Sequence, residues 1–367
     1  MIYFVIAVLT IDFILWYIFL FLRSKKQKIS EEDLPYCSVL IMARNEENHI
    51  SSCIDSLLSQ VYPKEKYEIL VCDDNSTDGT AEVLKAYENN DNVRLFSGDY
   101  PVIEHLNNKA QGLDYLAKQA NGEVLLFTDA DCVMKDGWLK NMAAGVIKNN
   151  KIVIAPTVPV ISSFLSALQR IDWIMALGRV VAVQGIGIPV TGNGNNMAMP
   201  AKAYKESGGY KATHSSHTED AAIFYLVREK TGIGAGVVAN NRAIAQTQPK
   251  LKWQELVSQR LRWWLGGISE APGWLIFYLA EALWILVFIA LLISGFSVSA
   301  FAWLTGRIVL RVLYNCSLPF SFKKIAFFYY ISAVILFDFY SIILNFTVLV
   351  KWGLGKSPEW KGREVRS

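Results

Sequence analysis

A repeated alternation of apolar runs and helical periodicity constrains the fold of this chain most strongly. Three short apolar runs, "YCSVLIMA", "YEILVC" and "EVLLFT", each end at a polar cluster and are each followed by a stretch with helical periodicity. Strands that alternate with helices form a mostly parallel sheet. The sequence therefore predicts an α/β domain, which we place at residues 34–270.

The polar clusters after these runs predict a shared site. They are Arg44–Glu46, Asp73–Asn75 and Asp129–Asp131. Any one of them could be an ordinary solvated turn. In a parallel sheet, however, ligands bind at the carboxyl ends of the strands, so residues far apart in sequence would line one crevice.

Asp129 and Asp131 indicate a metal site within that crevice. In an extended segment, residues two apart point the same way, so both carboxylates would face one side. Carboxylate oxygens suit Mg²⁺ or Mn²⁺, which keep open positions for substrate phosphates. A glycosidase-like acid/base pair is the rival interpretation, but acids so close on one strand end are poorly placed to flank a bond from opposite faces.

The flanks of the domain predict membrane segments. The hydrophobic fraction of 52% is high for a soluble enzyme, and residues 2–22 form an apolar run of spanning length. Arg23, Lys25, Lys26 and Lys28 follow it without an intervening acid. We therefore expect residues 1–23 to be an N-terminal transmembrane anchor, and the positive-inside rule predicts that the domain faces the cytoplasm.

A second apolar block covers residues 274–350, followed by a basic tail at 351–367. Segments 274–296 and 325–350 are each long enough to span a bilayer. Segment 298–318 carries Arg307 and Arg311, so it could span with its arginines paired inside the bundle or lie at the interface. The candidate partners of these arginines are Asp12, Glu281 and Asp338. We expect a multi-pass protein of the inner (cytoplasmic) membrane.

The cysteines and the net charge argue against a disulfide-rich, a zinc-binding and a nucleic-acid-binding protein. The five cysteines are scattered without a CxxC pair, which fits a reducing compartment without a disulfide framework or structural zinc. The net charge of +3 is small, and the polar region shows no basic stripe interleaved with aromatic residues. We therefore expect no nucleic-acid partner.

The ordered set of motifs resembles a known family. The set comprises "SVLIMARNEE", "VCDDNSTDGT", Lys109 ahead of "NGEVLLFTDADC", "SGGY", "TED" at 218–220 and "QRLRW" at 259–263. Together these motifs resemble family 2 glycosyltransferases with the Rossmann-like GT-A fold, above all membrane-anchored members with a Q-x-x-R-W motif. The resemblance covers about residues 36–270. The Q-x-x-R-W motif falls on a predicted interfacial helix at about 252–268.

The resemblance implies roles for individual residues. On the donor side it implies contacts to the nucleotide sugar from Ala43, Glu46, Asp73, Asp74, Lys109, Asp129, Asp131, Gln259 and Arg262, with Asp131 and then Asp129 as metal ligands. On the catalytic side it implies Asp220 as the base, with Glu219 and Arg262 beside it. On the acceptor side it implies Trp263, and a loop that holds Asn195 and Asn196.

The function implied is an inverting, metal-dependent hexosyltransferase. It would move a sugar from a nucleotide-diphosphate sugar, with UDP as the family default, to a hydroxyl of a membrane lipid or lipid-linked glycan. A carboxylate such as Asp220 can take the proton from that hydroxyl. One alternative is a processive polysaccharide synthase subunit that depends on export partners, because three or four spans are too few for a self-contained channel.

Two interpretations from other classes explain less of the sequence. A sugar nucleotidyltransferase would need a glycine-rich loop after the first strand, but "MARNEEN" contains no glycine. A non-catalytic membrane scaffold or transporter would account for the apolar segments and leave the ordered motifs unexplained.

Overall fold

The computed structural model describes residues 2–24, 29–271, 286–316, 324–360 and 363–364. Its centre is a seven-stranded sheet in the order β3-β2-β1-β4-β8-β6-β9. Only β8 among these strands runs against its neighbours, so the predicted mostly parallel sheet is confirmed. The strands are β1 (Cys37–Ala43), β2 (Tyr67–Asp73), β3 (Val93–Ser97), β4 (Val124–Asp129), β6 (Lys151–Ile154), β8 (Met197–Pro200) and β9 (Gly234–Val237).

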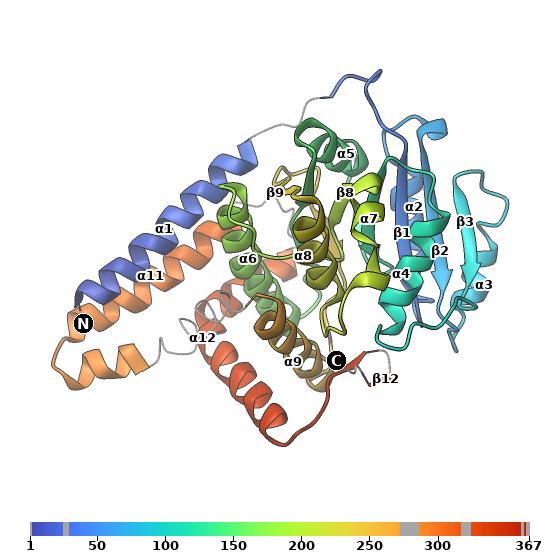
Figure 1. Cartoon of the computed structure of the whole chain (residues 1–367). Helices are drawn as coiled ribbons and strands as arrows, with labels where there is room; N and C mark the ends of the chain where they lie inside the picture. The colour runs from blue at the N-terminus through green and yellow to red at the C-terminus, as the bar shows by residue number, and fades with distance from the viewer. Residues whose placement is uncertain (1, 25–28, 272–285, 317–323, 361–362, 365–367) are drawn as a thin grey trace.

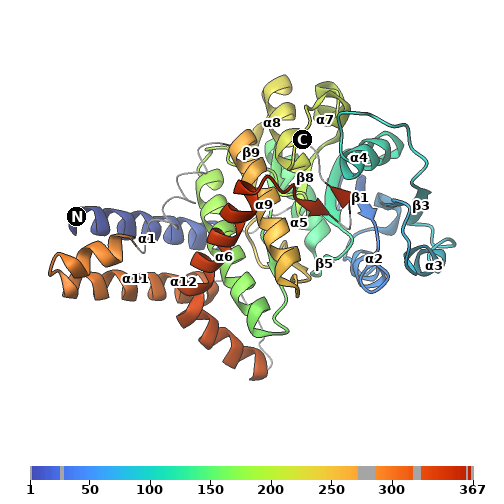
Figure 2. The same cartoon turned by 90° about the horizontal axis from the view of Figure 1, so that it is seen from below.

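Helices cover both faces of the sheet because its strands are apolar on both faces (Figures 1 and 2). In β1, Val39 and Ile41 pack into the core on one face, whereas Leu40 and Met42 pack into the core on the other. The first face carries α2 (Ile50–Leu58), α3 (Thr80–Lys85) and α5 (Trp138–Asn149). The second carries α4 (Asn108–Gln119), α7 (Ala201–Ser207) and α8 (Glu219–Thr231).

The register of the sheet brings the predicted polar clusters to one edge. Ala43 pairs with Asp73 across β1 and β2, and Met42 pairs with Asp129 across β1 and β4. Arg44 joins two of the clusters, since its Nη1 donates to the carbonyl oxygens of Asp74 (2.6 Å) and Asn75 (2.9 Å). The expectation that these clusters share one end of the sheet is confirmed.

Smaller elements complete the domain. A three-stranded sheet in the order β5-β10-β7 lies beside the main one and consists of β5 (Val133–Met134), β7 (Thr157–Pro159) and β10 (Ala245–Thr247). Two short 3₁₀ turns cover Lys64–Lys66 and Tyr210–Ala212. A two-stranded hairpin near the C-terminus consists of β11 (Glu359–Trp360) and β12 (Arg363–Glu364).

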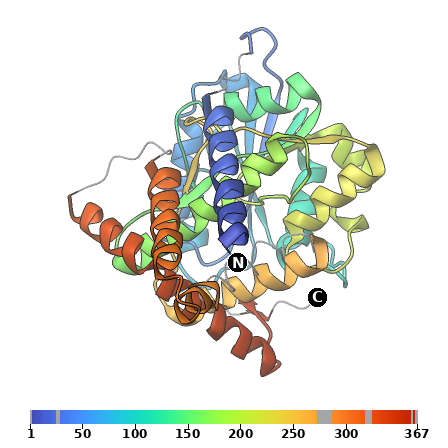
Figure 3. The same ribbon diagram turned by 90° about the vertical axis from the view of Figure 1, so that its left-hand side faces the viewer.

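A second hydrophobic core joins the domain to the flanking helices. It contains residues of α1 (Ile2–Ser24), α6 (Phe164–Gly185), α9 (Trp253–Glu270), α11 (Ser297–Cys316) and α12 (Lys324–Gly353). Helices α1 and α11 lie side by side and project from the sheet, and α6 contacts both of them (Figures 1 and 3). Residues 286–293 form a further short helix. The flanking helices therefore pack directly on the α/β domain.

Charged side chains inside this second core pair with each other, as the sequence suggested. Arg307 and Arg311 of α11 both pair with Asp338 of α12. Asp12 of α1 pairs instead with Arg179 of α6, across 3.0 Å. Glu281 and most of the predicted span 274–296 lie outside the described residues.

Within the described ranges, one helix is long and apolar enough to cross a bilayer, namely Phe328–Gly353 of α12. The apolar part of α1, Ala7–Leu22, is shorter. In the most apolar stretch of α12, 44% is buried inside the molecule, so part of the apolar surface of this helix packs against other helices. The predicted transmembrane arrangement, including that of segment 298–318, stays a prediction.

Candidate active site

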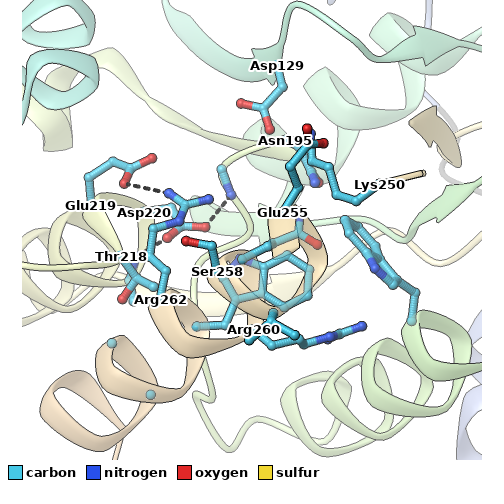
Figure 4. Close-up of a pocket in the computed structure, with 18 of the residues that line it drawn as sticks. Asp129, Asn195, Thr218, Glu219, Asp220, Lys250, Glu255, Ser258, Arg260 and Arg262 are labelled. Carbon is cyan, nitrogen blue, oxygen red and sulfur yellow. Dashed lines mark hydrogen bonds and ion pairs between the residues drawn. The ribbon is translucent and has the colours of Figure 1, made fainter. Parts of the chain in front are cut away.

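A cavity of about 1490 Å³ lies at the carboxyl edge of the sheet. It is bounded by the end of β4, the loop before β8, the start of α8, one face of α9, and parts of α6 and α12. Eight of the predicted site residues line it: Glu46, Asp129, Asp131, Asn195, Glu219, Asp220, Gln259 and Arg262. A ninth predicted site residue, Trp263, lines it as well. Residues from four separate motifs therefore meet in one space (Figure 4).

The two acids of Asp-Ala-Asp have different surroundings. Asp129 Oδ1 lies 2.7 Å from Lys109 Nζ, and that ammonium also lies 3.0 Å from Glu219 Oε1. Asp131 Oδ1 accepts a hydrogen bond from the Thr247 hydroxyl across 3.1 Å. Asp129 is thus neutralised by Lys109, whose side chain is 13% exposed, whereas Asp131 has no ion-pair partner in the described part of the chain.

This arrangement fits a divalent ion held partly by substrate. The described residues contain no group of three or more His, Cys, Asp or Glu side chains placed to hold a metal. Asp131, with Asp129 two residues before it, would supply the protein ligands, and phosphate oxygens or water would supply the rest. Mg²⁺ and Mn²⁺ sites in phosphate-binding proteins are commonly built in this way.

Glu219 is the centre of an ionic cluster. Burial alone would raise its pKa, but Lys109 and Arg262 outweigh burial and lower the pKa of Glu219 to about 2. The Arg262 guanidinium lies 3.9 Å from the second carboxylate oxygen of Glu219 (Figure 4). Lys109 is therefore a link between the Asp-Ala-Asp and Thr-Glu-Asp motifs, and its own pKa is raised because the charges of Asp129 and Glu219 outweigh its burial.

Asp220 has the opposite shift. Burial and the neighbouring charge of Glu219 raise the pKa of Asp220, although the Gly194 N–H, Lys109 and Arg262 act against them. Its Oδ2 accepts a hydrogen bond from Gly194 N–H at 2.7 Å, and its Oδ1 accepts one from Ala221 N–H at 2.9 Å. A half-buried carboxylate with a raised pKa is suited to accept a proton.

The loop "PVTGNGNN" approaches Asp220 closely. A Cβ on Gly192 would lie 2.3 Å from the Asp220 carbonyl oxygen, and one on Gly194 would lie 3.0 Å from the Asp220 Cβ. The sequence suggested that these glycines allow a ligand to approach the backbone. In the structure they make room for the candidate base.

Helix α9 holds its motif residues against the same site. Gly266 packs on Thr218, since a Cβ on Gly266 would lie 2.2 Å from the Thr218 hydroxyl. Near the helix end, Glu270 accepts hydrogen bonds from Ser216 (2.7 Å) and pairs with His214 (2.8 Å). Glu270 and Gly266 were not found by sequence reasoning, because neither belongs to the Q-x-x-R-W spacing.

Some predicted residues do not reach this cavity. Asn196 is fully buried, accepts from Trp138 Nε1 and donates to the carbonyls of Pro156 and Ala243. This buried position contradicts the predicted contact of Asn196 with the acceptor, and we assign Asn196 to the core instead. Ala43 is also fully buried, and its carbonyl accepts from the Asp74 N–H at 2.8 Å.

The acidic pair after β2 lies next to the cavity without lining it. Asp73 accepts hydrogen bonds from the Ser76 backbone and hydroxyl, and the buried Asp74 accepts one from the Tyr100 hydroxyl at 2.9 Å. Their place at the end of the adjacent strand is compatible with the nucleotide-side role that the resemblance implies. The role itself stays a prediction.

Comparison with known proteins identifies the domain. Residues 38–205 match the model of the family described as Glycosyl transferase family 2. This segment, a little under half of the chain, is similar to family 2 glycosyltransferase domains. The GT-A fold is also shared with a solved structure, the mannosyltransferase PcManGT from Pyrobaculum calidifontis in complex with GDP-Man and Mn²⁺. That structure is 15% identical, with a TM-score of 0.57 over 97% of this chain and 100% of the other.

Curated relatives of the glycosyltransferase domain match over shorter lengths. Glycosyltransferase AglE of Haloferax volcanii is 38% identical over 112 residues, which are 29% of this chain and 34% of the relative. Poly-beta-1,6-N-acetyl-D-glucosamine synthase of Staphylococcus epidermidis is 27% identical over 206 residues, which are 55% of this chain and 48% of the relative. The chain thus spans a third to a half of these relatives' length.

Proposed function

We propose that this protein is an inverting, metal-dependent glycosyltransferase. It transfers a sugar from a nucleotide-diphosphate sugar to a hydroxyl of a membrane lipid or lipid-linked glycan. The observation that carries the proposal is the meeting of Asp131, Asp220 and Arg262 in one cavity of a family 2 domain. These groups supply a metal ligand, a base and a cation, which are what the reaction needs.

The reaction follows from the chemistry of these side chains. The acceptor oxygen attacks the anomeric carbon, and its proton passes to the Asp220 carboxylate. The bond from the anomeric carbon to the diphosphate oxygen breaks, and the nucleoside diphosphate leaves with the electron pair. Attack opposite the leaving group inverts the anomeric centre, giving a glycoside and a nucleoside diphosphate.

Two features lower the barrier for this single displacement. Arg262 places positive charge beside the departing diphosphate, where preorganised charge stabilises the transition state most. A Mg²⁺ or Mn²⁺ ion bound at Asp131 would supply further positive charge to the diphosphate. Asp220 is held in one orientation by the Gly194 and Ala221 N–H groups, so no rotation is needed before it accepts the proton.

The location at the membrane belongs to the same proposal. Large apolar side chains are exposed along α1, α11 and α12, among them Ile14, Phe301, Ile335 and Phe346. Water disfavours so much exposed apolar surface, whereas a bilayer accommodates it. We place these helices in the cytoplasmic membrane with the catalytic domain on the cytoplasmic side, where the basic residues after α1 point to the same orientation.

A donor panel tests the proposal. Membranes that contain the full-length protein are incubated with UDP- and GDP-sugars and either Mn²⁺ or Mg²⁺, and the products are identified by mass spectrometry. UDP-sugars are the first donors to test, and GDP-mannose is included because the Pyrobaculum structure binds it. A glycosylated lipid supports the proposal, and a released polymer favours the processive synthase. If no donor gives a product, the proposed sugar transfer is excluded.

A further inference from the structure

Three residues that line the cavity each carry a buried polar atom without a hydrogen-bond partner. These atoms are the Thr218 hydroxyl oxygen, Gln259 Oε1 and Trp173 Nε1, and none has a hydrogen-bond partner in the described part of the chain. Buried polar groups are nearly always hydrogen-bonded, so three exceptions around one cavity need an explanation. A bound substrate that completes these hydrogen bonds provides one.

Trp173 stands apart because it belongs to none of the recognised motifs. It lies on α6, its side chain lines the cavity, and it is only 7% exposed. An indole N–H can only donate, and a buried tryptophan usually finds an acceptor for it. The missing hydrogen-bond acceptor for the Trp173 N–H would therefore be an oxygen atom of the bound ligand.

The Trp173 ring is held in place by a closed set of contacts between α6 and α9. Its ring meets that of Trp263 edge to face, with the centroids 5.0 Å apart. Arg260 lies over the Trp263 ring at 4.6 Å and forms an ion pair with Asp172, the neighbour of Trp173. The two indoles thus form a preorganised aromatic wall, because each ring is fixed by a partner on the other helix.

Besides its charged side chains, the cavity is lined by uncharged amides and hydroxyls. They include Thr191, Asn193, Asn195, Gln248, Gln254 and Ser258. Such groups both donate and accept hydrogen bonds, which matches the hydroxyls of a sugar, and indole rings offer an apolar surface to the C–H face of a pyranose.

We propose that Trp173 is an acceptor-binding residue and that the group it binds is a sugar ring. This inference rests on the proposed function and narrows it, because the acceptor is then a lipid-linked glycan rather than a lipid without sugar. Trp173 donates its N–H to a sugar oxygen, and Trp263 beside it contacts the same ring. The acceptor hydroxyl is thereby oriented towards Asp220.

The test compares two acceptors and two variants of the full-length protein in nanodiscs. The acceptors are a polyprenyl diphosphate that carries one N-acetylglucosamine and the same lipid without sugar. Trp173→Phe keeps an aromatic ring and removes the N–H. Trp264→Phe is the matched control, since Trp264 packs against Trp352 and does not line the cavity.

We expect transfer to the sugar-bearing acceptor, with little transfer to the bare lipid. Loss of one hydrogen bond should raise the acceptor KM of Trp173→Phe about 5–10-fold, while kcat and donor hydrolysis without acceptor change little. Trp264→Phe should keep the wild-type KM. Should Trp173→Phe not fold, tryptophan fluorescence of the wild-type protein gives a second measurement, because a soluble octyl glycoside should change it and octyl phosphate should not.

The outcomes separate this inference from the proposed function. An unchanged acceptor KM in folded Trp173→Phe overturns the inference, and so does equal use of the bare lipid. In either case, intact donor turnover would leave the proposed function standing. Absence of donor hydrolysis and of transfer with every donor overturns both.

Discussion

The backbone N–H of Gly194 donates a hydrogen bond to Asp220 Oδ2 across 2.7 Å. This bond connects the loop before β8 with the first turn of α8 and fixes the direction of the candidate base. Gly192, two residues earlier, approaches the Asp220 carbonyl so closely that a Cβ would lie 2.3 Å from it. The position of Asp220 is thus set by a neighbouring loop as much as by its own helix.

Replacement of Asp220 by Asn should remove catalysis and leave donor binding. The amide keeps the size of the side chain but cannot take the proton from the acceptor hydroxyl, so transfer should fall about 10²–10⁴-fold. Initial rates of transfer and calorimetric binding of the nucleoside diphosphate measure the two effects. Unchanged transfer in Asp220→Asn would exclude Asp220 as the base.

Replacement of Glu219 by Gln should shift the pH dependence of the rate. Asp220 must be ionised to act as a base, so activity should rise with pH through its pKa. Burial and then the charge of Glu219 raise that pKa. Removal of the Glu219 charge should therefore move the rising limb of kcat/KM to lower pH, because Lys109 and Arg262 then act on Asp220 without opposition.

Initial-rate profiles between pH 4 and 8 measure this shift. The same substitution removes the Glu219 carboxylate, whose pKa is lowered to about 2. In the wild type, this ionised carboxylate stabilises the folded protein, and that stabilisation is lost only as the pH falls towards 2. Glu219→Gln should therefore be less stable than wild type at neutral pH in a thermal melt. A rising limb that moves to higher pH would contradict the assignment.

Two adjacent glycines of α9 form a matched pair for mutation. A Cβ on Gly266 would lie 2.2 Å from the Thr218 hydroxyl, whereas a Cβ on Gly267 would meet nothing within 4 Å. Gly266→Ala should push α9 away from the Thr-Glu-Asp segment and lower kcat. Gly267→Ala should keep kcat and stabilise the helix by up to about 1 kcal/mol, since alanine has the higher helix propensity.

Kinetics and thermal melts of both variants test this packing. Equal activity of Gly266→Ala and Gly267→Ala would show that the close approach of α9 to Thr218 is not needed for transfer.

Replacement of Asp131 by Asn should weaken metal binding with little loss of stability. Asp131 has no ion-pair partner among the described residues, so its charge is available to a metal. We expect Mn²⁺-dependent binding of nucleoside diphosphate to weaken at least tenfold, as measured by calorimetry at several Mn²⁺ concentrations. Asp129→Asn is the contrasting variant, and it should lower the melting temperature because the buried Lys109 loses one of its two carboxylate partners.

An equal effect of the two substitutions on metal binding and on stability would contradict the separate roles of Asp131 and Asp129.

The parts of the fold that the sequence predicts are those with a strong local signal. Buried parallel strands give continuous apolar runs, so β1, β2 and β4 were found, and their register places Ala43, Asp73 and Asp129 together. Helix α6 was not predicted. It is buried among helices on one side and packs against the sheet domain on the other, so it lacks the polar stripe that marks a surface helix.

The site was predicted less completely because neighbouring residues can face opposite ways. Asn195 lines the cavity, whereas Asn196 begins the approach to β8 and points into the core. Lys109 was expected beside the nucleotide, yet its ion pairs with Asp129 and Glu219 depend on α4, β4 and α8 coming together. Such contacts depend on tertiary packing and leave no local pattern in the sequence.

Thr347, Val350 and Leu354, at the carboxyl end of α12 and just beyond it, line the same cavity as Asp220 and Trp263. A protein truncated after residue 271 would therefore lose a wall of its substrate cavity along with the helix most suited to crossing a bilayer. Removal of this apolar segment to solubilise the protein would alter the cavity in which we propose that the acceptor reacts. Helix α12 and the cavity would have to evolve together, because each substitution on the cavity side of α12 changes both.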